Sequence, residues 1–134
     1  MLKHGIMAAV ILSAGAMFYA ECALAYDGKS LSTAYNDCIE KADGVTSNMH
    51  DCMDIEIKVQ DKRLNLNYGK FADTLNPERR KKLVELQRLW IKYRDQKCEF
   101  LYDPEGGTFA GILGHSCFLE MTAERADELE IKTY

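Results

Sequence analysis

Four cysteines and a nearby histidine are the residues of this chain best suited to covalent chemistry. Cys98 or Cys117 beside His115 could form a thiol–imidazole pair, in which the imidazole takes the thiol proton and leaves a nucleophilic thiolate. Such a pair requires the cysteine to stay reduced. Its plausibility therefore depends on the compartment in which the protein works.

The residues that could form metal or phosphate sites do not have the required spacing. His50, Cys52 and Asp54 are two positions apart, which on a helix spreads their side chains around the axis instead of directing them at one metal ion. Gly106-Gly107 lacks the lysine and hydroxyl residue that complete a phosphate-binding loop. No two carboxylates stand out as an isolated acid–base pair. The sequence therefore predicts a protein that is not an enzyme and that needs no cofactor or metal.

Residues 1–25 have the three parts of a secretory signal: a short basic start, an apolar stretch and small residues at the cleavage positions. The apolar stretch is shorter than the ~20 residues of a membrane span, and Glu21 before Cys22 disfavours attachment of a lipid. We expect cleavage after Ala25, no stable membrane anchor, and one domain over residues 26–134 in the bacterial periplasm or secreted. There, four cysteines would form disulfides rather than nucleophiles. They are Cys38, Cys52, Cys98 and Cys117.

The spacing of apolar residues predicts an all-α fold. Steps of three and four residues predict helices over about residues 32–41, 46–75 and 77–101, and a last one over residues 116–131. Residues 108–115 contain several glycines and are expected to form a loop or a frayed turn. With short connections, the chain is predicted to be a small antiparallel bundle of three to four helices with two disulfides.

Four cysteines allow three pairings, and antiparallel hairpins favour one of them. Cys38 and Cys52 lie at similar distances on either side of the first predicted turn, and Cys98 and Cys117 flank the last one in the same way. We therefore favour the disulfides Cys38–Cys52 and Cys98–Cys117. Each would contribute roughly 3 kcal/mol in the chain-entropy description.

Several polar residues share helix faces with apolar ones. A buried hydrogen-bonded layer between the helices is the favoured interpretation, and Arg94 and Arg125 would then need carboxylate partners. Asp61 and Asp95 are the candidates. The alternative is a recognition surface anchored by aromatic side chains. The residues concerned are Asp61, Leu64, Asn65 and Tyr68, then Gln87, Trp90, Arg94 and Asp95, and finally Thr122 and Arg125.

These residues also form a recognisable motif. It runs as Asp61-x2-Leu64-Asn65-x2-Tyr68, then Gln87-x2-Trp90-x3-Arg94-Asp95-x2-Cys98, then Cys117-x4-Thr122-x2-Arg125. With this spacing the chain resembles the LprI-like family, named for a mycobacterial lipoprotein described as a lysozyme inhibitor. The resemblance covers about residues 35–129. It implies a small exported bacterial helical domain that inhibits a lysozyme.

The leading hypothesis is an exported protein-binding module that inhibits lysozyme or another peptidoglycan-cleaving enzyme. A net charge of −4 suits a basic protein partner and not nucleic acid. An immunity-type protein that neutralises a delivered toxin, and a structural or chaperone-like envelope component, are the alternatives; the oligomeric state is left open. One exposed segment is expected to be either a partner-binding loop or a plain connector. It consists of Asp103, Pro104, Glu105, Gly106, Gly107, Thr108 and Phe109.

Overall fold

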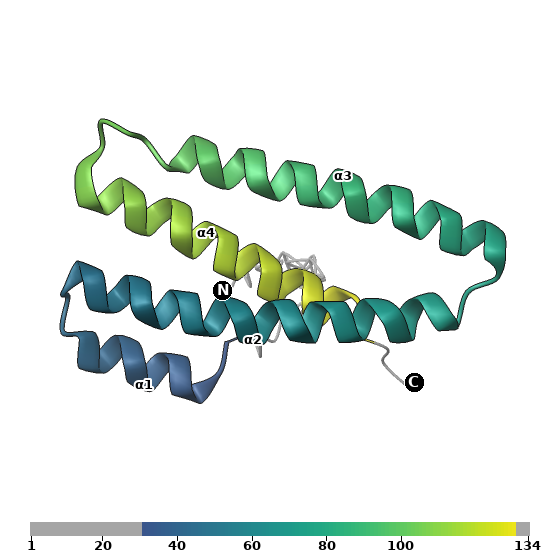
Figure 1. Ribbon diagram of the computed structural model, residues 1–134, viewed down its shortest axis with the longest axis horizontal. Coiled ribbons are helices and arrows are strands. Elements are labelled where there is room, and N and C mark those ends of the chain that lie inside the picture. The colour runs from purple at the N-terminus through teal and green to yellow at the C-terminus, as the bar shows by residue number, and fades with distance from the viewer. Residues whose placement is uncertain (1–30, 131–134) are drawn as a thin grey trace, which may run out of the picture.

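Four α-helices account for the regular structure of residues 31–130, the part of the chain that the computed structural model describes. They are α1 (Thr33–Ala42), α2 (Thr46–Asp73), α3 (Pro77–Leu101) and α4 (Gly107–Glu128). The helices lie side by side in the order α1, α2, α4, α3 (Figure 1). The prediction of an all-α helical bundle with two disulfides is confirmed. Helices that follow one another in the sequence are antiparallel, as expected from the short connections, but α2 and α4, which pack against each other, run in the same direction. The expected signal peptide, residues 1–25, lies outside the described residues.

None of the helices in residues 31–130 combines the length and the apolar character that a membrane crossing requires.

Local sequence signals set most of the helix ends. The Ser32 hydroxyl accepts a hydrogen bond from the Tyr35 backbone N–H at 3.1 Å and so caps α1. Asn76 caps α3 in the same way, by accepting from the Arg79 N–H at 2.9 Å. The residue before α2 is Val45, which makes no side-chain cap. Thr46 and Ser47 are already helical, so neither hydroxyl caps this helix.

The last helix in the sequence occupies the middle of the bundle. Helix α4 packs against both α2 and α3, whereas α2 and α3 make little direct contact although they are neighbours in sequence. Leu119, Ala123 and Ala126 in α4 are completely buried. Two alanines in this face let the neighbouring backbones come close, and Leu119 fills the remaining space. The core of the molecule is therefore built around α4.

The start of α4 differs from the prediction. Residues 108–115 are helical, so Thr108 and Phe109 belong to the first turn of α4 and not to a loop. Gly114 serves close packing instead of a turn: a Cβ atom on this residue would lie 2.8 Å from the Cβ of Tyr102 and 3.1 Å from the backbone oxygen of Cys98. Glycine at this point lets α4 approach the end of α3.

Replacing Gly114 with alanine is expected to destabilise the protein by about 1–3 kcal/mol, because the added methyl group meets the base of a side chain and a backbone oxygen. Gly69 in α2 provides the matched control, since its Cβ would meet nothing within 4 Å. Gly69→Ala should leave stability unchanged or raise it by up to ~1 kcal/mol, the gain in helix propensity. Urea denaturation of the oxidised proteins measures both. Equal stabilities of the two variants would contradict this account of Gly114.

Two disulfides join the outer helices to the inner ones. Cys38–Cys52 links α1 to α2 with a Cα–Cα distance of 5.8 Å, and Cys98–Cys117 links α3 to α4 with a distance of 5.4 Å. Both distances are ordinary for disulfides. This is the pairing that hairpin geometry favoured.

Candidate functional site

A pocket of about 560 Å³ opens at the end of the bundle where α2 and α4 begin and α3 ends. In Figure 1 this is the left end, which also carries the turn between α1 and α2. Residues of α2, α3 and α4 line the pocket, together with Tyr102, which directly follows α3. They are His50, Asp54, Ile57, Asp95, Cys98, Glu99, Tyr102, Gly111, Gly114, His115 and Phe118.

Two histidines meet across this pocket. The Nδ1 atoms of His50 and His115 are 2.6 Å apart, and the rings are stacked with centroids 4.9 Å apart. One ring must therefore donate a hydrogen bond and the other accept it. The Nε2 of His115 also lies 3.0 Å from a carboxylate oxygen of Asp54. This chain of contacts ties the first half of α2 to the first half of α4.

The pocket contains no free thiol, because Cys98 and Cys117 are joined to each other. The thiolate nucleophile that Cys98 or Cys117 could have formed with His115 is thus absent from the structure. Within residues 31–130 there is also no cluster of three or more histidine, cysteine, aspartate or glutamate side chains arranged to hold a metal ion.

Carboxylates and aromatic rings form the mouth of the pocket. The side chain of Asp54 is 62% exposed and that of Asp95 is 51% exposed, and Glu99 is exposed one turn further along α3. Tyr102 and Phe118 supply apolar walls. A mouth of this kind can receive a cationic side chain, because the carboxylates attract the charge and the rings cover the aliphatic stem.

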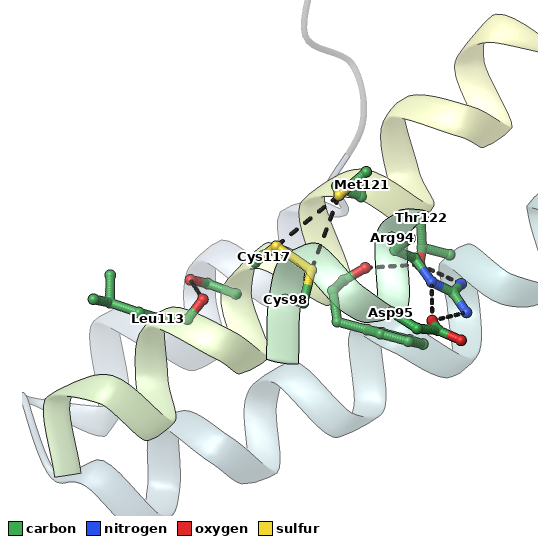
Figure 2. The surroundings of a disulfide bond; sticks show 9 residues. Arg94, Asp95, Cys98, Leu113, Cys117, Met121 and Thr122 are labelled. Carbon is green, nitrogen blue, oxygen red and sulfur yellow. Dashed lines mark hydrogen bonds and ion pairs between the residues drawn. A yellow bond between two sulfur atoms is a disulfide. The ribbon is translucent and has the colours of Figure 1, made fainter. Parts of the chain in front are cut away.

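Behind the pocket, the disulfide Cys98–Cys117 lies in a sulfur-rich part of the core. The Met121 sulfur is 3.9 Å from the Cys98 sulfur and 4.0 Å from that of Cys117 (Figure 2). All three residues are buried. Trp90 and Phe118 pack around them. The disulfide therefore also fills core volume between α3 and α4.

Arg94 makes the first of two polar links between α3 and α4. Its guanidinium donates to Asp95 at 2.9 Å and to the Thr122 hydroxyl at 3.2 Å, as Figure 2 shows. The same group lies 3.9 Å from the centre of the Phe118 ring and 5.0 Å from that of Trp90. The carboxylate partner of Arg94 is thus Asp95, which was one of the two partners predicted from the sequence.

Arg125 makes the second link. Its Nε donates to the Gln87 side-chain oxygen at 3.0 Å, and a second nitrogen lies 2.7 Å from a carboxylate oxygen of Glu128. The carboxylate partner is thus Glu128, from the last turn of α4 itself. Polar links therefore join α3 to α4, but their carboxylates lie at the surface: the side chain of Asp95 is 51% exposed and that of Glu128 is 65% exposed.

The contribution expected from Asp61 and Asn65 of α2 is wrong. Both residues are exposed, and the Asn65 amide donates to the Asp61 carboxylate at 3.1 Å. They lie on the rim of a groove of about 290 Å³ between α2 and α3, and the motif residues of both helices face it. Its lining is Asp61, Leu64, Asn65, Tyr68, Val84, Gln87, Arg88, Trp90, Ile91 and Arg94.

Other polar residues of α2, which were not predicted to face inward, are buried or, in the case of Arg63, partly buried. Glu56, 2% exposed, accepts from the backbone N–H of Ser32 at 2.7 Å, from the Ser32 hydroxyl at 2.6 Å and from the Gln60 amide at 2.6 Å. Arg63 donates to Gln60 at 2.9 Å and to the backbone oxygen of Ala123 at 2.9 Å. It also forms an ion pair with Asp127. These contacts connect α1, α2 and α4.

The segment expected to project lies at the pocket end. Because α4 begins at Gly107, the non-helical part of this segment is residues 103–106, and these residues are exposed. The Asp103 side chain accepts from the Glu105 backbone N–H at 2.9 Å, and its backbone oxygen accepts from Gly106 at 3.0 Å. The segment is a short, internally hydrogen-bonded turn that adds two carboxylates to this end of the molecule.

Comparison with known proteins identifies the family. The family model described as "Lysozyme inhibitor LprI" matches residues 38–129. The match begins at Cys38, in the middle of α1, and covers α2, α3 and α4 completely. The curated protein R02472 of Rhizobium meliloti (strain 1021), which is named as uncharacterized, is 39% identical over 49 residues. That match covers 36% of this chain and 35% of the relative, so it spans about a third of the relative's length. No solved structure matches the chain. Because the family model matches more than half of the residues of the chain, the chain belongs to the LprI family of lysozyme inhibitors, which is a family of inhibitors and not of enzymes.

Proposed function

We propose that this protein is an exported inhibitor that blocks a lysozyme, or another peptidoglycan-cleaving enzyme, with the acidic pocket end of the bundle. The family match over residues 38–129 carries the proposal. The two disulfides support a place outside the cytoplasm, and the periplasm or the extracellular medium is where such an enzyme would be met.

The distribution of charge supports the choice of surface. Asp54, Asp95 and Glu99 line the pocket, and Asp103 and Glu105 follow in the adjacent turn. The opposite end, where α3 begins, carries the basic run at residues 79–82. An enzyme with a cationic surface would be attracted to the first end and repelled from the second, which orients the encounter.

The shape of the pocket suggests how the complex is anchored. A lysine or arginine side chain of the enzyme would enter between Tyr102 and Phe118 and meet the carboxylates of Asp54 and Glu99. Arginine and aromatic residues often supply the dominant contacts of interfaces. The exposed turn at residues 103–106 would add negative charge beside that anchor without itself contacting the enzyme.

Titration of a cationic lysozyme with the oxidised mature protein tests the proposal. We expect stoichiometric inhibition of muramidase activity that weakens as salt is added. Glu99→Lys should raise the inhibition constant about tenfold, chiefly through slower association. Glu124→Lys, the same charge change at an exposed site late in α4, is the control and should inhibit normally. If a micromolar excess of the protein inhibits none of several lysozyme types, the proposal is wrong. Equal loss in both variants would place the interface elsewhere.

A further inference from the structure

Helix α3 carries an exposed apolar stripe that no other part of residues 31–130 covers. Leu86, Leu89, Tyr93 and Phe100 follow one another at steps of three, four and seven residues, so they share one side of the helix. They are 58%, 65%, 59% and 85% exposed, respectively. The spacing is that of a coiled-coil seam. Side chains of this size, aligned over several turns, are typical of a contact between helices.

Helix α3 is also the least buried long helix of the bundle. Of its 25 residues, the buried ones are Leu83 and Cys98, and its main neighbour is α4. The side of α3 that faces the bundle carries Trp90 and Arg94. At 3.6 residues per turn, it is rotated around the helix axis by roughly a third of a turn from the exposed stripe. The stripe is therefore a second apolar face, separate from the one that packs in the bundle.

The two ends of the stripe carry opposite charges. At the same helical spacing it continues to Lys82 and Arg79 at the start of α3, and it leads to Asp103 and Glu105 just after the end of α3. A stripe that is cationic at its head, apolar in the middle and anionic at its tail is complementary to a reversed copy of itself. A parallel copy would instead oppose like charges, which is unfavourable.

We propose that two copies of this protein pair through the α3 stripe in antiparallel orientation, related by a two-fold axis near its middle. The head of each copy would then lie beside the tail of the other, with Arg79 and Lys82 facing Asp103 and Glu105. A two-fold axis makes every contact occur twice, so a modest stripe yields a stable interface.

A groove at the head fits this arrangement. It has a volume of about 350 Å³, and Leu83, Leu86 and Leu129 are among its apolar walls, with Lys82 on its edge. Phe100, in the tail, is the most exposed large apolar side chain of the described residues. Antiparallel pairing brings the Phe100 ring of one copy to the head of the other. The groove is of a size to receive that ring.

The pairing leaves the acidic pocket open. Asp95, Glu99 and Tyr102 lie on the other flank of α3 from the stripe, because they follow a different series of three- and four-residue steps. An antiparallel dimer would therefore present two acidic pockets at its opposite ends. Each dimer could hold two enzyme molecules.

Sedimentation velocity of the oxidised protein over a range of concentrations tests the pairing. We expect a reversible dimer, and Leu89→Glu should raise its dissociation constant about 100-fold, since about 1.4 kcal/mol is lost at each of two symmetric sites. Ile55→Glu, at a residue 61% exposed on α2, is the control and should leave the dimer intact. A monomeric wild type, or a dimer that tolerates Leu89→Glu, would overturn the proposal.

Charge exchange tests the orientation. Lys82→Glu and Glu105→Lys should each weaken the dimer, and the double variant should recover most of the loss. Failure of the double variant to recover would exclude antiparallel pairing. If the wild type is monomeric and Leu89→Glu abolishes lysozyme inhibition, the stripe contacts the enzyme and the dimer is disproved. Inhibition that is unchanged in a monomeric Leu89→Glu variant supports both the dimer and the separate location of the acidic pocket.

Discussion

Replacing Cys98 and Cys117 together with alanine is expected to lower the free energy of unfolding by about 3 kcal/mol and to remove most of the proposed lysozyme inhibition. The first figure follows from the 19-residue separation that this disulfide closes. The second effect follows from position. The disulfide holds the end of α3 against α4, where α3 has little other burial, and Cys98 lines the acidic pocket. Urea denaturation and muramidase inhibition measure the two effects.

The other disulfide provides the control. Cys38–Cys52 closes a separation of 14 residues, so its loss should cost about the same free energy, again about 3 kcal/mol. It attaches α1, which contributes no residue to the pocket. The Cys38→Ala/Cys52→Ala protein should therefore inhibit normally under conditions in which it is folded. Equal loss of inhibition in the two double variants would show that the pocket does not depend on Cys98–Cys117.

Replacing Glu56 with alanine is expected to destabilise the protein by about 2–4 kcal/mol, because it removes a buried carboxylate that accepts three hydrogen bonds. Two of the donors belong to Ser32, the residue that caps α1. The phenol of Tyr35 lies in the same environment: burial, and then the carboxylates of Glu120 and Glu56, raise its pKa. The loss should therefore be greatest around α1.

Hydrogen exchange separates this local effect from a general one. In Glu56→Ala, the amides of α1 should lose protection first, while those in the middle of α4 exchange only on global unfolding. Glu56→Gln keeps one acceptor and should fall between the alanine variant and the wild type. Glu124→Ala, at an exposed position, should change stability by less than about 0.5 kcal/mol. A Glu56→Ala protein as stable as that control would show that the buried contacts contribute little.

The fold was largely predictable because its helices follow simple rules. Three- and four-residue apolar spacing located α2 and α3, and the predicted start of α3 at residue 77 is correct because Asn76 caps the helix there and Pro77 is its first residue. The error at residues 108–115 has a definite cause. Gly114 looks like a helix breaker in the sequence, but its role is to admit Tyr102 and the Cys98 backbone, and that neighbour becomes apparent only in three dimensions.

The polar residues of α2 were harder to assign, for a related reason. Glu56, Gln60, Arg63 and Asn67 follow steps of four, three and four, which is an inward pattern, yet each is usually exposed in proteins. Glu56 and Asn67 can be buried because they have partners outside α2: Ser32 for Glu56, and for Asn67 the backbone oxygen of Ala126, which lies 2.8 Å from the Asn67 amide nitrogen. Asp61 and Asn65 were assigned inward because they adjoin Leu64. The pocket itself could not be foreseen, since it depends on how the ends of three helices meet.

The central position of α4 has a consequence for the time at which the protein can acquire its structure. Of the four helices, the one around which the core is built leaves the ribosome last, and in the proposed export it would also cross the membrane last. Until then α2 and α3 have almost no surface to share. The four-helix domain should thus stay unfolded until α4 has been made, which suits the passage through a secretion channel that the proposed export would require. Formation of Cys98–Cys117 would report that translocation is complete.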